Sequence, residues 1–194
     1  MKHKPVKGTQ GYLELQRKRS LIRTIVFFAI SLAVYLIGYL TTKSNQNYLT
    51  IAAVLGCLPA SKSAVNTIMF YRYHGCSSKN SKQILPHTEE LSTLWDLVFT
   101  SYEKNFEIHH MALRDNTLIG FTTHPKCDFA ACEKHLRTLL AQNGLKVTVK
   151  IFSDISKYTT RLDQLAELSA NPENASAISE KEEQILGVLR AISL

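Results

Sequence analysis

Two histidines and two cysteines lie within twelve residues and form the group in this chain most like a metal site. They are His124, Cys127, Cys132 and His135, spaced as H-x2-C-x4-C-x2-H. Imidazole and thiolate are both zinc ligands, and a helix would place Cys132 and His135 one turn apart. The spacing is not a familiar finger pattern, however, and Cys132 falls on the apolar face of that helix, where an ordinary buried cysteine belongs. We therefore favour packing over zinc at these four residues and expect no cofactor.

Adjacent histidines, His109 and His110, are the second candidate for chemistry. A strand over 106–113 would point their rings to opposite faces, with His110 on the face of Phe106, Ile108 and Ala112. A general base needs a partner and a pocket, and the sequence names neither, so we expect structural histidines. The chain also contains no phosphate-binding glycine loop, no G-x-S-x-G and no H-E-x-x-H motif.

Two apolar stretches near the N-terminus dominate the rest of the chain. Residues 24–40 carry no charge, and residues 48–70 are interrupted only by Ser61, Lys62 and Ser63. The apolar core of a bilayer is about 30 Å thick and needs about 20 helical residues to cross it. The two stretches therefore predict a hairpin of transmembrane helices, with spans at about 21–41 and 48–70. A cleaved signal peptide is the alternative for the first stretch, but it has no small-x-small cleavage site.

Charge is divided unequally along the chain. Residues 1–82 carry 12 Lys and Arg and one acid, Glu14, whereas residues 83–194 carry 11 Lys and Arg and 15 acids. Basic residues flank the spans and only Lys43 lies between them, which predicts both termini in the cytoplasm. The mildly acidic second part disfavours nucleic acid as a partner. Three of the four cysteines would then lie in the cytoplasm, where thiols stay reduced.

Small residues recur every four positions in the second span and so share one face of the helix. They are Ala52, Gly56, Ala60 and Ala64, which predict close packing in the membrane. Ala29 and Ala33 offer a matching patch on the first span. The alternative is that alanine is simply common in such helices.

Lys62 is the one charge inside a span. Its long side chain can extend toward the cytoplasmic face of the bilayer, and we favour this snorkelling over a transport or lipid-headgroup role. In the same helix Pro59 cannot donate a backbone hydrogen bond, which predicts a kink.

The soluble part is predicted to be a small α/β (α+β) domain with the order helix, three strands, helix, strand, helix, helix. Asp128 and Gly144 bound one expected helix, and Ser179 with Glu182 resembles a capping box for the last one. The expected elements are a helix over 88–95, strands over 97–102, 106–113 and 117–122, a helix over 128–143, a strand over 145–152, a helix from 154, a break at 171–174 and a helix over 180–194.

The predicted organisation is a basic arm over 1–20, a membrane hairpin over 21–73, a linker over 74–86, a cytoplasmic domain over 87–170, and a break with a C-terminal helix over 171–194. We expect a multi-pass protein of the bacterial inner membrane. Its partners would be the lipid bilayer and either another protein or a second copy of itself. The favoured function is a non-catalytic, membrane-anchored interaction domain. The alternatives are a membrane-associated enzyme using the histidine pair or the His/Cys group, and a small transport subunit built around Lys62.

Overall fold

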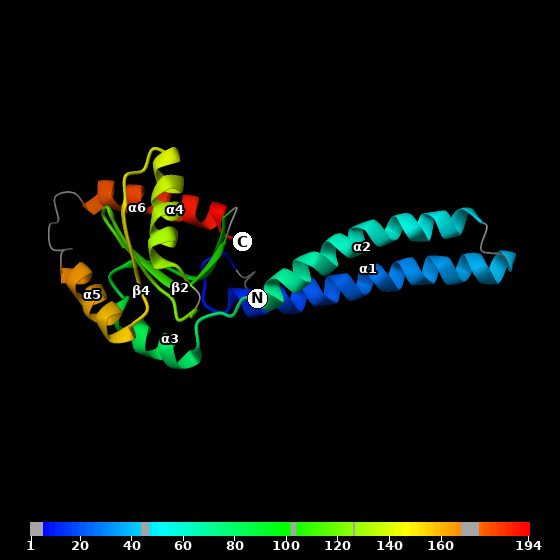
Figure 1. Cartoon of the computed structure of the whole chain (residues 1–194), viewed down its shortest axis with the longest axis horizontal. Coiled ribbons are helices and arrows are strands. Elements are labelled where there is room, and N and C mark those ends of the chain that lie inside the picture. Colours follow the sequence, from blue (N-terminus) through cyan, green and yellow to red (C-terminus); the bar gives the residue numbers. More distant parts are fainter. Residues whose placement is uncertain (1–5, 44–46, 102–103, 126, 168–174) are drawn as a thin grey trace. The chain divides into compact units, whose positions relative to one another are not determined.

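The computed structural model describes residues 6–43, 47–101, 104–125, 127–167 and 175–194, with the side chains of the last helix described from Glu180 onward. In this part the chain forms six α-helices and one mixed four-stranded sheet (Figure 1). It divides into two compact units. One is Leu13–Tyr73, and the other combines Met1–Tyr12 with His74–Leu194.

The first unit is a pair of long antiparallel helices, α1 (Tyr12–Thr42) and α2 (Tyr48–Arg72), which lie side by side (Figure 1). Asn47 caps the start of α2, where its side chain accepts the Thr50 N–H, and the helix runs on through Pro59. Both helices are long and apolar enough to cross a membrane. Only 11% and 17% of the residues in their most apolar windows are buried, so neither helix is the core helix of this structure.

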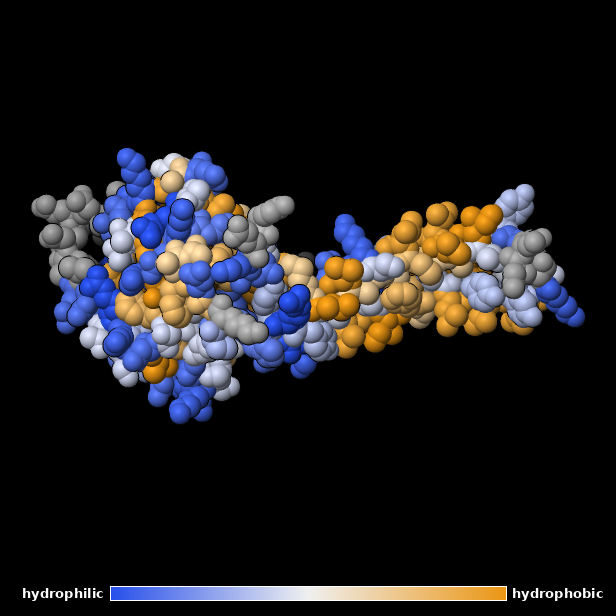
Figure 2. Space-filling view, in the orientation of Figure 1, coloured by the Kyte–Doolittle hydropathy of each residue, from blue (hydrophilic) through white to orange (hydrophobic). Residues whose placement is uncertain are grey.

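The face of this helix pair seen in Figure 2 is apolar along most of its length. Large aliphatic side chains such as Ile25, Ile37 and Leu58 are exposed on the helix pair. The side chains buried between the helices are small or hydroxyl-bearing: Ser20, Thr24, Ser31, Ala53, Ala60, Ser63 and Thr67. The patch expected at Ala29 and Ala33 is exposed, so it is not the face of α1 that packs on α2.

The sheet of the second unit has the order β1-β2-β3-β4. Its strands are β1 (Ser92–Thr100), β2 (Asn105–Arg114), β3 (Thr117–Phe121) and β4 (Thr148–Phe152). The first two pairings are antiparallel, and β3 pairs with β4 in parallel. A parallel pair needs a crossover, which helix α4 (Phe129–Gln142) provides. As predicted, Asp128 caps α4, and Gly144 follows it with a positive φ of 77°.

Helices cover both faces of the sheet (Figure 1). On one face α4 and α6 (Ala175–Ile192) pack on a core that includes Ile108, Leu136 and Leu189. On the other face α5 (Ile155–Glu167) and the short α3 (Ser78–Ile84) pack on a core that includes Trp95 and Tyr158. The strand expected over 145–152 is present as β4, and the expected last helix packs its buried apolar side chains on this sheet.

Three local expectations are wrong. Residues 88–95 do not form a helix, because Ser92 begins β1 and pairs with Leu113 of β2. The helix lies upstream instead, as α3 and the 3-10 helix η1 (Leu85–His87), within the segment predicted to be a linker. The capping box also fails: α6 begins at Ala175, and Glu182 accepts hydrogen bonds from Ser92 Oγ and the Asp115 N–H. The break predicted at 171–174 lies outside the described residues.

Gly8 and Leu194 each make a backbone hydrogen bond to the outer edge of β1. The Trp95 N–H donates to the Gly8 carbonyl at 2.9 Å, and the Leu194 N–H donates to the Val98 carbonyl at 2.9 Å. Gly8 has a φ of 86°, and a Cβ there would lie 2.5 Å from Leu94 Cδ2. Residues 6–11 of the predicted basic arm are thus part of the domain, and they cover a strand edge of the kind that pairs with other chains.

Candidate functional site

Strands β1 and β2 share an irregularity that gathers polar side chains on one part of the sheet. Leu94 and Leu97 of β1 belong to the same core although they are three positions apart in the sequence, and so do Ile108 and Met111 of β2. In a regular strand, residues on the same face are an even number of positions apart. The alternation of side chains between the two faces is therefore interrupted at this point in both strands. Asp96 lies at this interruption with a φ of 54°, a left-handed conformation that aspartate tolerates better than most residues.

Two buried carboxylates hold backbone segments at this place. Asp96 is 3% exposed, and its two oxygens accept the N–H groups of Gly11 and Cys76 at 2.7 Å each. Glu107 is 5% exposed and accepts the His74 N–H at 2.7 Å. Burial raises the pKa of Glu107, an effect that the His74 hydrogen bond and the nearby histidines reduce. Both carboxylates therefore act first as acceptors for backbone amides.

The histidine pair lies beside these carboxylates. His110 is fully buried, its Nδ1 lies 2.6 Å from the Tyr158 hydroxyl, and its ring packs on Trp95. His109 Nε2 lies 3.0 Å from Thr123 Oγ1, and its ring meets Phe121 edge-on. Both rings therefore approach the core on the α5 side. The expectation of opposite faces is wrong because the strand changes phase between Ile108 and Met111.

Burial determines the protonation of both rings. It lowers the pKa of His110 to about 3 and, with help from His124 and His74, lowers the pKa of His109 to about 4. Both imidazoles are thus neutral at physiological pH. His109 Nδ1 and His110 Nε2 are buried without a hydrogen-bond partner. A base this weak, enclosed in this way, suits a packed interior better than proton transfer to a substrate.

Other polar groups of the cluster share this character. Burial, reinforced by Asp96, raises the pKa of the Cys76 thiol to about 11. Burial also raises the pKa of Tyr158. These groups are held in their neutral forms, so the cluster has no activated nucleophile among them.

The His/Cys group does not assemble into a site. Cys127 and Cys132 meet, and this contact lowers the pKa of Cys127 and raises that of Cys132. Cys132 is fully buried in the core, whereas the ring of His135 packs against Phe106. His124 instead lies close enough to His109 and Glu107 to influence their pKa values. Among the described residues, no three His, Cys, Asp or Glu side chains are placed to hold a metal ion.

Hydroxyl groups form a polar seam between α1 and α2, which we define as Ser20, Thr24, Ser63 and Thr67. Thr24 Oγ1 lies 2.8 Å from Ser63 Oγ and 2.9 Å from Thr67 Oγ1, and Ser20 Oγ lies 2.8 Å from Thr67 Oγ1. Each of these side chains is buried. The seam satisfies its own hydrogen bonds, as hydroxyls in an apolar surrounding must.

The predicted small-residue face overlaps this interface in part. Ala60 is buried, Gly56 and Ala64 are half-buried, and Ala52 is exposed. A Cβ on Gly56 would lie 2.8 Å from Ser31 Oγ, so the glycine permits close approach of the helices. That these four small residues drive packing in a membrane stays a prediction.

Two basic side chains of the helix pair, Arg17 and Lys62, differ in their contacts. Arg17 donates to the Tyr73 carbonyl at 2.7 Å, and its guanidinium lies 5.0 Å from the centre of the Tyr71 ring. Lys62 is exposed. It therefore does not line the seam, and a transport path between α1 and α2 would not include it.

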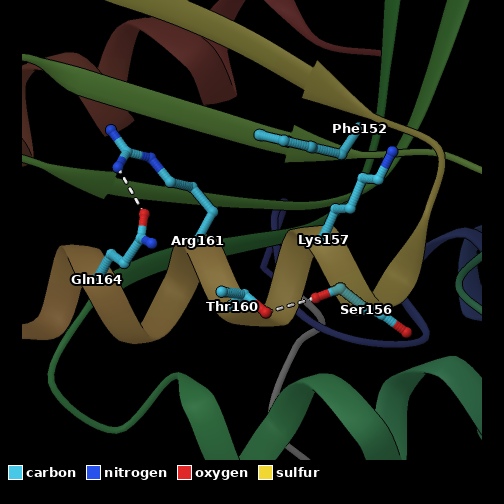
Figure 3. A pocket seen from close by; sticks show the side chains of 6 residues that line it. All are labelled: Phe152, Ser156, Lys157, Thr160, Arg161 and Gln164. Carbon is cyan, nitrogen blue, oxygen red and sulfur yellow. Dashed lines mark hydrogen bonds between the residues drawn. The ribbon is translucent and has the colours of Figure 1, made fainter.

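A shallow surface hollow of about 400 Å³ lies between α5 and β4 (Figure 3). Arg161 Nη1 donates to Gln164 Oε1 at 2.8 Å, and Thr160 donates to the Ser156 carbonyl. Among the described residues, the lining of the hollow includes the cations Lys157 and Arg161 and no Asp, Glu, His or Cys. Its lining residues are Phe152, Ser156, Lys157, Thr160, Arg161 and Gln164.

The carboxylates and the seam were missed by sequence reasoning. Asp96 and Glu107 lie within apolar strand sequences, and a buried acid in such a strand is the signal that could have identified them. Similarly, Ser20, Thr24, Ser63 and Thr67 show the four-residue spacing of one helix face. The chain matches no protein-family model, no curated protein and no solved structure.

Proposed function

We propose that this chain is an integral membrane protein that anchors a non-catalytic interaction domain to the cytoplasmic face of a bacterial inner membrane. One observation supports the proposal that the helix pair is a membrane anchor: α1 and α2 expose aliphatic side chains and bury hydroxyls between them. A helix pair in water has the reverse arrangement. In a bilayer the exposed aliphatic surface is solvated by lipid, and the seam supplies interhelical hydrogen bonds.

The chemistry of the domain supports binding rather than catalysis. Its buried carboxylates accept backbone amides, and its buried histidines are neutral and enclosed. The hollow between α5 and β4 has an apolar floor at Phe152 and cations at Lys157 and Arg161. We assign the partner to this hollow, and its charge and shape fit an acidic, partly apolar peptide segment of another protein.

Site-specific crosslinking in cells tests this proposal. A photoreactive amino acid at Thr160 should yield a discrete crosslinked product in the membrane fraction. Lys157→Glu should abolish the product, because the reversed charge repels an acidic segment. Lys146→Glu, which makes the same change at an exposed position outside the hollow, should not. Loss of the product in both charge variants would overturn the assignment. So would the absence of any product from the chain without a charge substitution.

A further inference from the structure

The hydrogen bonds of the seam show which residues of α1 and α2 lie at the same level along the hairpin. Thr24 Oγ1 and Ser63 Oγ are 2.8 Å apart, so their neighbours Arg23 and Lys62 also lie at one level. Ser20 meets Thr67 one helical turn away, which places Arg19 about 6 Å from Arg23, toward the N-terminal end of α1. Lys62 is therefore not an isolated charge: Arg23 of the other helix lies at its level, and Arg19 lies one turn farther along α1.

These three cations also share a side of the hairpin. Arg19 and Arg23 directly precede the inward-facing Ser20 and Thr24, and Lys62 directly precedes the inward-facing Ser63. One residue corresponds to about 100° of rotation. Because the two helices are antiparallel, stepping back by one residue turns toward the same side on both. The structure thus gathers Arg19, Arg23 and Lys62 on one face.

The cationic face, which we define as Arg19, Arg23 and Lys62, has no salt-bridge partner in the described part of the chain. All three residues are exposed, and none forms a salt bridge with a described residue. The acidic residue of the helix pair is Glu14, which precedes Arg19 by more than one turn. Arg17, in contrast, already contacts Tyr71 and the Tyr73 carbonyl.

The apolar surface begins directly beyond this face. On α2 the residues from Tyr48 to Ser61 span about 21 Å, at about 1.5 Å per residue. This length is shorter than the bilayer core of about 30 Å, so the side chains of Arg23 and Lys62 must extend toward the headgroups. These two cations, with Arg19 one turn away, attract anions, and in a membrane the available anions are lipid phosphates.

We propose that Arg19, Arg23 and Lys62 bind the headgroup of an anionic phospholipid whose acyl chains lie along the exposed apolar side chains of the hairpin. This inference rests on the proposed membrane insertion and goes beyond it, because it names a lipid class and three residues. It also gives Lys62 a role that requires no transport path.

The test is lipid enrichment around the full chain reconstituted in vesicles of phosphatidylcholine and phosphatidylglycerol at about four to one. Polymer extraction isolates the protein with its surrounding lipid, and mass spectrometry measures the lipid ratio. We expect phosphatidylglycerol to be enriched about twofold over the bulk vesicle. Arg23→Gln with Lys62→Gln should return the ratio to the bulk value.

A matched control is Lys18→Gln with Lys79→Gln, which removes the same net charge from exposed positions outside the cationic face. This variant should keep the enrichment. Equal loss in both double variants would overturn the site and leave only general charge attraction, and absence of enrichment in the unmodified chain would also overturn it. Failure of the chain to float with the vesicles would instead overturn the membrane insertion itself.

Discussion

Individual side chains of the domain are arranged to be neutral where they are buried. His110 and Tyr158 form a hydrogen-bonded pair without charge, and the Cys76 thiol is kept protonated. Asp96 is different, since backbone amides of Gly11 and Cys76 satisfy its two oxygens. Ionisation of a buried group in this region therefore opposes folding, unless the fold supplies hydrogen-bond donors to the charged form.

The two buried histidines predict sensitivity to acid. Their pKa values fall from an ordinary 6.5 to about 4 and about 3, so below pH 6.5 the unfolded chain binds protons that the folded chain rejects. Stability should fall as pH drops through this window, by at most about 1.4 kcal/mol per pH unit for each histidine. The ring centroids of Trp95, the only tryptophan, and His110 lie 4.1 Å apart, so tryptophan fluorescence in detergent is the measurement of unfolding.

The double variant His109→Gln, His110→Gln should flatten this pH dependence. His135→Gln, a histidine outside the pair, should leave the dependence unchanged. An unaltered slope in the double variant would show that other groups carry the acid response.

Glu107 predicts a pH dependence of stability opposite to that of the two histidines. Because burial raises its pKa, its contribution to stability is present below the ordinary pKa and is lost as pH rises through the folded value. Glu107→Gln keeps an acceptor for the His74 N–H without the charge, and should raise the melting temperature at pH 7. Glu107→Ala removes the acceptor and should cost about 1–3 kcal/mol. If Gln destabilises as much as Ala, the charge itself is required.

At the scale of secondary structure, each of the two units depends on a close contact between elements. Between α1 and α2 the contact consists of the seam and of Gly56 against Ser31. In the domain it is the packing of α6 on the sheet, where Ile185 and Leu189 are fully buried.

Substitutions in the seam should loosen the helix pair. Thr24→Val with Thr67→Val preserves shape but removes the hydroxyl network, and should cost about 1 kcal/mol. Gly56→Leu should cost more, because any side chain there meets Ser31. Cys57→Leu, at the neighbouring exposed position, is the control and should have little effect. Unfolding by SDS in mixed micelles measures each variant, and equal losses for Gly56 and Cys57 would refute the packing argument.

Helix α6 should be essential for the fold of the domain. Leu189→Ala should cost about 2–5 kcal/mol because it opens a cavity in a closed core. Removing residues 176–194 should lower the melting temperature further, whereas Glu183→Ala at an exposed position should not. A truncated chain that melts like the full one but has lost its partner would identify α6 as a docking helix instead.

For the whole molecule, the distribution of charge predicts the topology. The net basic part contains the helix pair, and the net acidic part is the bulk of the domain. In whole cells, an impermeant thiol reagent should label a cysteine placed at Asn45 and should not label one placed at Lys79. The parent chain, with its four free cysteines, provides the background. The reverse labelling would invert the proposed orientation.

The sequence by itself determined the features that depend on local pattern. The two long apolar helices, the strands near 106–113 and 117–122, and the α4 helix between Asp128 and Gly144 all follow from composition, periodicity and capping residues. These signals are local because a helix cap or an alternating strand involves only nearby residues.

Tertiary structure decided the rest. Residues 88–95 carry a helix-start pattern, but pairing with β2 makes a strand of the segment from Ser92. The phase shift at Asp96 requires backbone donors from Gly11 and Cys76, which are distant in sequence. His124 lies in the connection after β3 and influences His109 and Glu107, whereas His135 lies on α4 and packs against Phe106. Buried polar groups take whichever partners the fold brings to them, and the spacing of residues along the chain does not contain that information.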